Sequence, residues 1–460
     1  MTDTLPQDVG QEKIHSVTVR VPNNHRLLQL KRTLDWEALT GVATQHLRMA
    51  GFNVDGVLRG RRLNVAPYVP MLVLSFVMRL NLRETEAYMA ENAVGRLFVG
   101  VDNCAAIQVR DHSTIGRIRA GLGAAGLDAL NALVVRQAAS LGFANPEVLS
   151  ADTTAQELSI GYPHEAGILR GMAARCLRAA ERLRCHGKRK LGKVYDAATG
   201  LIANAKEYHL FAKTTERKTE LIEAMVRQTR RMLKASRDVA GRLASSSSQG
   251  TRRATSVLRA MAEVGDKLLP QIDYWLRTGN VAKDKILHAG LPMARSIVRN
   301  KAGKKVEFGI QQLIMSIGGG YLLGRSILIR MGESKMPLLA LQTYREVFGA
   351  TATPTLAVYD RGGWSQENVR QLQNEGVQKV GILPNGRARW RVHGRDRERV
   401  MTERATTEGK IGTLKTSYGF NKPRERRGDT VLAVAPRSIL AFNLNKLIRD
   451  ICAANEKKAA

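Results

Sequence analysis

Strand-like and helix-like segments alternate in the C-terminal part of this chain, and this alternation limits the possible folds more than any other feature. The hydrophobic pattern predicts strands over 304–317, 320–330, 353–360 and 377–383, and helices over 336–350 and 365–376. The glycines at 318–320 predict a hairpin between the first two strands. One further strand is expected upstream, over 146–160. The fold class is therefore α/β, a mixed sheet with flanking helices.

Long stretches outside these strands have helical period. Residues 71–100 predict two packed helices, and 205–244 and 251–276 predict a helical hairpin that turns at 245–250. The expected organisation is a tail at 1–25, an all-helical N-terminal domain at 26–144, a first strand region at 145–166, a long helical insertion at 167–300, the rest of the sheet domain at 301–452 and a tail at 453–460.

The charge balance indicates a polyanionic partner. The 460 residues include 72 Lys plus Arg and 41 Asp plus Glu, a net charge of +31. Residues 167–300 alone hold 28 Lys plus Arg against 11 Asp plus Glu. Such a surplus favours salt-sensitive binding to nucleic acid; a ribosome-associated or simply soluble basic protein is the alternative. The basic face of the insertion either lies along DNA or belongs to a dimerisation arm whose charges face water.

The segment DHSTIGRIRAGLG predicts a helix near its start. Asp111 or Ser113 is placed to cap a helix that begins near Thr114. Three arginines cluster at this helix start, where backbone N–H groups also favour phosphate, and we expect them to contact DNA: Arg110, Arg117 and Arg119. A helix-turn-helix DNA reader is one interpretation, and a helical scaffold with solvated arginines is the other.

Cysteine usage and hydropathy argue against secreted and membrane classes. Four scattered cysteines do not make a disulfide framework, and Cys185 next to His186 lacks the paired cysteine of a zinc site. The N-terminal segment has no signal-peptide core, and the best apolar stretch, 69–80, is too short to cross a bilayer. We expect a cytoplasmic, nucleoid-associated protein without a membrane segment.

Three acidic residues stand in settings that suit metal-assisted phosphoryl transfer. Asp152 lies inside a strand, where a lone carboxylate is costly unless it is paired or binds a metal. Asp360 ends a strand just before two glycines. On the last helix, Arg404, Glu408 and Lys415 lie within about 40° of one another, so one carboxylate is flanked by two cations. Such a stripe can hold a divalent ion beside phosphate oxygens.

Each acid also has a structural interpretation. Asp152 and Asp360 can be turn or cap residues, and Glu408 can be part of a surface ion pair. Glu403 is the rival for the third acid, but it lacks flanking cations on its helix face. Three other residues near the acids are open to a supporting role: Glu157 and Glu307 beside the site, and Trp364 stacking on a base or, more simply, packing.

These motifs resemble the bacterial insertion-sequence transposases that carry a DDE triad on an RNase H-like fold. The resemblance covers roughly 65–450 and rests on DHSTIGRIR, SADTT, YDRGGWS and the Arg404, Glu408, Lys415 spacing. That spacing matches the family's Y-x2-R-x3-E-x6-K motif at three of four positions, with Met401 in place of Tyr. The long basic insertion is a second departure and argues for a subgroup.

The resemblance implies DNA strand cleavage and strand transfer at the ends of an insertion sequence, with two Mg²⁺ or Mn²⁺ ions. Asp152, Asp360 and Glu408 are then both the catalytic residues and the metal ligands, with Asp152 shared by both ions, and Arg404 and Lys415 hold phosphates. The partners are double-stranded DNA (terminal inverted repeats and target) and further copies of the chain, at least a dimer. The rival functions are a domesticated, non-catalytic DNA-binding protein and an RNase H-like nuclease or resolvase that does not join strands.

Overall fold

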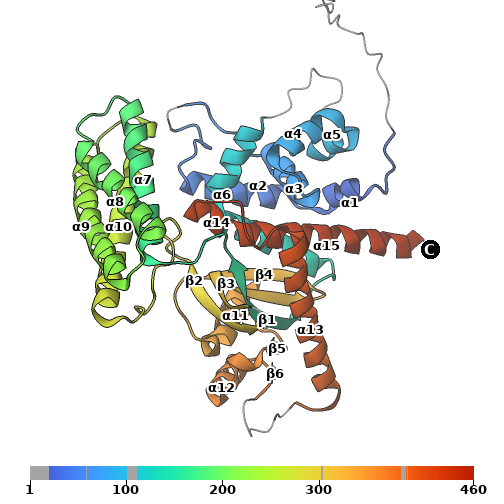
Figure 1. Cartoon of the computed structure of the whole chain (residues 1–460). Coiled ribbons are helices and arrows are strands. Elements are labelled where there is room, and N and C mark those ends of the chain that lie inside the picture. Colours follow the sequence, from blue (N-terminus) through green and yellow to red (C-terminus); the bar gives the residue numbers. More distant parts are fainter. Residues whose placement is uncertain are drawn as a thin grey trace, which may run out of the picture.

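The computed structural model describes residues 20–58, 60–100, 111–301, 304–384, 390 and 392–459. It is a mixed α/β fold: a group of N-terminal helices lies on one side of a six-stranded sheet, with the long C-terminal helix between them, and a helical bundle stands to one side (Figure 1). The predicted mixed α/β fold class is confirmed.

The sheet is built around β1, which lies between β3 and β5 in the strand order. The strands are β1 Asn145–Glu157, β2 Arg295–Lys301, β3 Lys304–Gly318, β4 Tyr321–Ile327, β5 Leu356–Tyr359 and β6 Lys379–Ile382. Their order is β2-β3-β1-β5-β6, and β4 also pairs with β3. β3 runs antiparallel to β1, whereas β5 and β6 run parallel to it. β2 and β4 pair with successive halves of β3.

The predicted strands are present, and β3 and β4 form the predicted hairpin. The expectation that helical structure continues to residue 300 is wrong, because Arg295–Lys301 is β2. This strand carries few apolar residues, and its Val298 is exposed. A polar edge strand lacks the alternation of buried apolar residues by which strands are recognised in sequence.

The N-terminal helices share one core with the sheet. They are α1 Arg26–Thr33, α2 Trp36–Met49, α3 Tyr68–Val77, α4 Leu82–Glu91, α5 Ala93–Val99 and α6 His112–Ser140. Where two helices were expected over 71–100 there are three, because Asn81 and Asn92 each cap a new helix. Asp111 caps α6, as predicted. Residues such as Leu30, Leu72 and Ile118 belong to the same apolar cluster as Leu313 of β3.

The insertion forms a four-helix bundle with its own apolar core (Figure 1). Its helices are α7 Glu165–Cys185, α8 Gly192–Leu210, α9 Thr215–Arg242 and α10 Gln249–Thr278. The predicted hairpin is present as α9 and α10. The segment 205–244 is not one helix, because α8 ends at Leu210 and the side chain of Thr214 caps α9.

The remaining helices cover the two faces of the sheet. They are α11 Met336–Phe348, α12 Gln366–Asn374, α13 Gly394–Ser417, α14 Gly428–Leu432 and α15 Val434–Ala459, with single 3₁₀ turns η1 Glu333–Lys335 and η2 Arg361–Gly363. Leu341 of α11 packs in one cluster with Ala151 of β1, whereas Ile411 of α13 packs with Ile314 of β3 in another. α13 therefore lies on the face opposite α11.

Within the described residues, two stretches are long and apolar enough to cross a membrane by length and composition, namely α6 and the segment 428–458. The stretch 69–80, expected to be the best candidate, belongs mostly to the shorter helix α3. Much of both long stretches is buried inside the protein, and α15 packs against α6, α3 and β4. Core helices of this length meet the same criterion, so this is weak evidence for a membrane span.

Candidate functional site

Asp152 and Asp360 lie at equivalent places on neighbouring strands. In the parallel pairing of β1 with β5, Ala151 is in register with Tyr359, so Asp152 and Asp360 are the next residue of each strand. Adjacent strands are about 4.8 Å apart, so both acids start from the same edge of the sheet. Asp360 caps the turn η2, where its side chain accepts a hydrogen bond of 2.6 Å from the backbone N–H of Arg361. The carboxyl end of this strand pair is a favoured place for a ligand.

Helix α13 crosses the sheet face onto which Asp152 projects. The Thr407 hydroxyl donates to the Ser150 hydroxyl at 2.8 Å, and the Ser150 hydroxyl donates to the Glu403 carbonyl at 3.3 Å. Side chains two residues apart on a strand share a face, so Asp152 projects to the same side as Ser150. The helix that carries Glu408 is therefore held directly over the strand that carries Asp152.

Arg404 joins the other two acids. Its Nη2 lies 2.8 Å from Oδ1 of Asp360, and its Nε lies 3.2 Å from Oε1 of Glu408. The Arg404 side chain is 32% exposed, against 40% for Asp360 and 54% for Glu408, so water still reaches the group. One guanidinium thus forms ion pairs with two carboxylates that lie 48 residues apart in the chain. The spacing in the sequence predicted the Arg404–Glu408 contact but not the link to Asp360.

The rival acid Glu403 belongs to a different part of the surface. Its charge acts on Lys410, whose Nζ donates to the Ser316 hydroxyl of β3 at 2.9 Å. Burial lowers the pKa of Lys410 to about 8, with a further lowering from Lys446 and an opposing effect of Glu403. Since Glu408 instead shares Arg404 with Asp360, this arrangement favours Glu408 as the third acid.

A fourth carboxylate, Glu333 in the turn η1, approaches the same edge. Thr153 donates a hydrogen bond of 3.3 Å to Oε1 of Glu333, and a Cβ on Gly362 would overlap the other oxygen. Burial raises the pKa of Tyr359, and the charges of Asp152, Glu333 and Asp360 raise it further. Tyr359 is 4% exposed, and Thr153 acts in the opposite direction on its pKa through a side-chain hydrogen bond.

Sequence reasoning did not find Glu333. It stands in the turn GESKMP between a strand and a helix, where an acidic residue is ordinary. Only the contact between η1 and η2 brings Glu333 to the acids. The nearby glycines were expected to let the backbone approach a ligand closely. Gly362 does allow a close approach, but to the carboxylate of Glu333.

The donor types at this edge suit a hard divalent cation, because Asp152, Asp360, Glu408 and Glu333 all offer carboxylate oxygens. The three predicted acids are not drawn together as tightly as metal ligands. Within the described chain, the group whose ligand atoms all lie within 4.8 Å of one another is Glu86, Asp111 and His112. At the strand edge, the guanidinium of Arg404 supplies the positive charge between Asp360 and Glu408.

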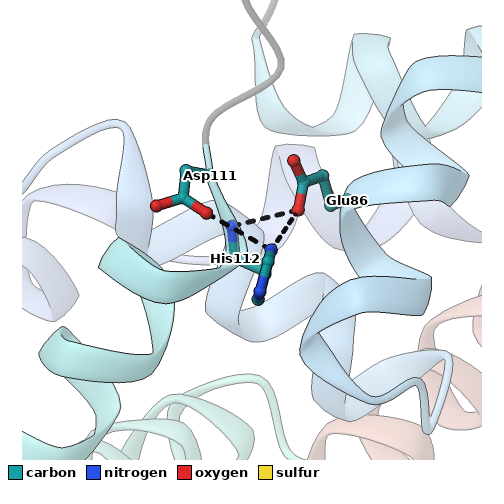
Figure 2. Close-up of side chains that lie close together, drawn as sticks. All are labelled: Glu86, Asp111 and His112. Atoms are coloured by element: carbon teal, nitrogen blue, oxygen red, sulfur yellow. Dashed lines mark hydrogen bonds and ion pairs between the residues drawn. The ribbon is translucent and has the colours of Figure 1, made fainter.

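Figure 2 shows how the Glu86, Asp111 and His112 side chains meet at the start of α6. His112 Nδ1 lies 2.6 Å from Oε2 of Glu86 and 3.2 Å from Oδ1 of Asp111. Asp111 also accepts hydrogen bonds from the hydroxyl and backbone N–H of Ser113, and these lower its pKa. Helix capping and an ion pair that ties α4 to α6 account for these contacts without a metal.

The other predicted DNA-binding residues are spread over different surfaces. Lys415 is half-buried near the end of α13. Arg117 is exposed and donates to the Thr114 hydroxyl at 3.1 Å. Arg119 points elsewhere, into a pocket against α15. Arg110 lies outside the described residues. The structure therefore does not place the predicted arginines on one face.

The remaining neighbours of the acids do not take part in the site. Glu157 lies five residues beyond Asp152 along β1, roughly 16 Å away, and is 4.0 Å from Lys422. Glu307 lies opposite Ile297 of β2, at that same distant end. A supporting role for these two acids beside the site is therefore wrong. Trp364 packs against the main apolar core, as the simpler interpretation expected.

Comparisons of the chain with protein-family models, with curated proteins and with solved structures found no match.

Proposed function

We propose that this protein is a DDE transposase that cleaves and joins DNA strands at the ends of an insertion sequence. The observation that carries the proposal is the meeting of three chain segments at one edge of the sheet. Asp152 lies within β1, next to the point where the parallel strand β5 ends and Asp360 follows, and Arg404 links Asp360 to Glu408 on α13. A net charge of +31 supplies the affinity for DNA that such a reaction needs.

The sheet supports an RNase H-like assignment of the fold. A long first strand has an antiparallel hairpin partner on one side and two parallel strands on the other. Asp152 lies on β1, Asp360 directly follows β5, and Glu408 lies on α13, which packs on β1. This is the arrangement expected from the resemblance to insertion-sequence transposases.

Asp152, Asp360 and Glu408 would hold the divalent cations, which polarise the scissile phosphate and lower the pKa of the attacking water or 3′-hydroxyl. Before DNA and cations arrive, Arg404 is paired with both Asp360 and Glu408 and offsets part of their negative charge. Its fork of N–H donors matches phosphate oxygens as well as carboxylates, so in the loaded site Arg404 can hold the strand beside the reacting phosphate. Lys415, about two turns beyond Glu408 along α13, can hold the same strand.

The test uses a donor DNA that contains the sequences on both sides of the coding region, incubated with purified protein and Mg²⁺ or Mn²⁺. Single replacements Asp152→Ala, Asp360→Ala and Glu408→Ala should abolish cleavage and leave DNA binding largely intact. Nicking and joining are measured separately on the same gel. Cleavage without joining would identify a nuclease or resolvase instead.

Glu403→Gln is the matched control, because Glu403 is the rival glutamate on α13 and its charge acts on Lys410. Wild-type activity in Glu403→Gln and none in Glu408→Gln supports the assignment. The reverse result would transfer the third acid to Glu403. Full cleavage by all three alanine variants would overturn the proposed function.

A further inference from the structure

A pocket of about 400 Å³ opens between the N-terminal helices and the end of the helix that carries Glu408. Its wall is formed by the loop between α3 and α4, by α6, by the residues that follow α13 and by α15. The polar and charged residues that line it are Arg79, Asn81, Arg119, Ser417, Glu425 and Arg437. Pockets of a few hundred Å³ are of the size that holds a small ligand.

The pocket has an excess of positive charge. Three arginines line it, and Glu425 is the one acidic residue in its lining. Arg437 Nη1 lies 2.7 Å from Oε1 of Glu425, so this carboxylate is already engaged. Two guanidinium groups, those of Arg79 and Arg119, are then left without a neutralising carboxylate in the pocket wall.

The guanidinium of Arg119 loses part of its solvation in the pocket. Burial lowers its pKa, Arg437 lowers it further, and Glu425 acts in the opposite direction. The Arg119 side chain forms no hydrogen bond or ion pair with another described residue. A desolvated guanidinium without a partner is unfavourable unless an anion arrives to bind it.

Arg79 is held in place by a strained backbone. Its φ is +54°, in the left-handed region that costs a non-glycine residue roughly 1–2 kcal/mol. Its guanidinium lies 5.8 Å from the centre of the Tyr418 ring, and its Nη1 donates to the Ser417 carbonyl at 3.4 Å. The strain thus places a cation at the mouth of the pocket, beside the end of α13.

We propose that this pocket binds a phosphate group of the DNA strand, through Arg79 and Arg119. Planar guanidinium groups bind phosphate oxygens in pairs of hydrogen bonds, and two of them can hold the two non-bridging oxygens of one phosphodiester. Ser417 follows Glu408 by nine residues, roughly 14 Å along the helix axis. That distance corresponds to about four nucleotides of one strand, so a strand in the acidic site can reach the pocket.

The choice of DNA as the carrier of the phosphate rests on the proposed function. The test is therefore made without divalent cations, so that it does not depend on cleavage. Affinity for a 30-base-pair duplex is measured at several salt concentrations for wild type, Arg119→Gln, Arg79→Gln and Arg119→Lys. If the phosphate contact needs both arginines, replacing either one should remove it and reduce the slope of log affinity against log salt by about 0.9.

We expect both glutamine variants to show a slope that is smaller by about one, and Arg119→Lys to keep most of the wild-type slope, because the charge remains. Arg83→Gln is the matched control: Arg83 is exposed at the start of α4 and does not line the pocket. Circular dichroism melts establish that each variant is folded.

Wild-type slopes in both glutamine variants would overturn the proposal. So would an equal decrease of slope in Arg83→Gln, since it would show only a general effect of charge. Deoxyadenosine monophosphate is the second probe. If it protects wild type against unfolding but not Arg119→Gln while the DNA slopes stay unchanged, the pocket takes free nucleotides and the assignment to DNA is wrong. Failure of cleavage alone would count against the proposed function and not against this pocket.

Discussion

Replacing Arg404 by alanine should have opposite effects on metal binding and on cleavage. The side chain makes two ion pairs, to Asp360 and Glu408, and all three groups are about one-third to one-half exposed. Exposed pairs of this kind contribute about 0.2–1 kcal/mol each. We therefore expect Arg404→Ala to lower the free energy of unfolding by no more than about 2 kcal/mol, and α13 to remain in place through its contacts with β1.

The same ion pairs must be broken before the two carboxylates can bind a cation. Their removal should then favour Mn²⁺ binding by about 0.4–2 kcal/mol, which corresponds to about 2- to 30-fold tighter binding. Cleavage should nevertheless fall, because the guanidinium that holds the strand is missing. If Arg404 only stabilised α13, its replacement would not strengthen Mn²⁺ binding while it weakens cleavage.

Mn²⁺ binding is followed by isothermal titration calorimetry, stability by urea unfolding and cleavage on the donor DNA. Arg399→Ala is the matched control, because Arg399 is an exposed cation on the same helix, away from Arg404. Arg399→Ala should change none of the three quantities appreciably. Weaker Mn²⁺ binding in Arg404→Ala, or cleavage equal to that of wild type, would refute the reasoning.

Three further predictions concern other parts of the molecule. Burial raises the pKa of Asp128 to about 7, with Glu346 adding to the rise and Arg325 opposing it. The stability associated with protonated Asp128 is present below about pH 4 and is lost as the pH rises through about 7. In urea unfolding, Asp128→Asn should therefore be more stable than wild type at pH 8, by no more than about 4 kcal/mol, and similar to wild type at pH 4. Equal stabilities at pH 8 would contradict this prediction. Glu333→Gln keeps the contact with Thr153 but removes a charge, so it should weaken Mn²⁺ binding several-fold with an unchanged melting temperature; unchanged Mn²⁺ affinity would exclude Glu333 from the site. Gly265→Ala places a Cβ against Leu233 between α9 and α10, so it should destabilise the bundle by about 1–3 kcal/mol in urea unfolding. A stability equal to that of wild type would show that the two helices can move apart.

Local patterns in the sequence were sufficient for most of the elements. Alternation of apolar residues and the glycines at 318–320 predicted the β3–β4 hairpin, and Asp111 predicted the start of α6. β2 was not predicted from the sequence, because a polar edge strand lacks the alternating apolar residues of a buried face. The helix boundary at Thr214 was not predicted, because the helical period continues on both sides of this capping residue.

In the candidate site, too, some contacts follow from the local sequence and others only from the tertiary structure. The spacing of Arg404 and Glu408 on one helix determines their contact, since it depends only on the turn of an α-helix. That Arg404 also meets Asp360, that Glu403 turns instead toward Lys410, and that Glu333 joins the acids were decided by how α13 and η1 pack on the sheet. The Arg79 and Arg119 pocket likewise arises where segments about 300 residues apart pack together. Periodicity and capping act between near neighbours in the chain and are visible in sequence, whereas contacts between distant segments depend on the three-dimensional packing of the whole core.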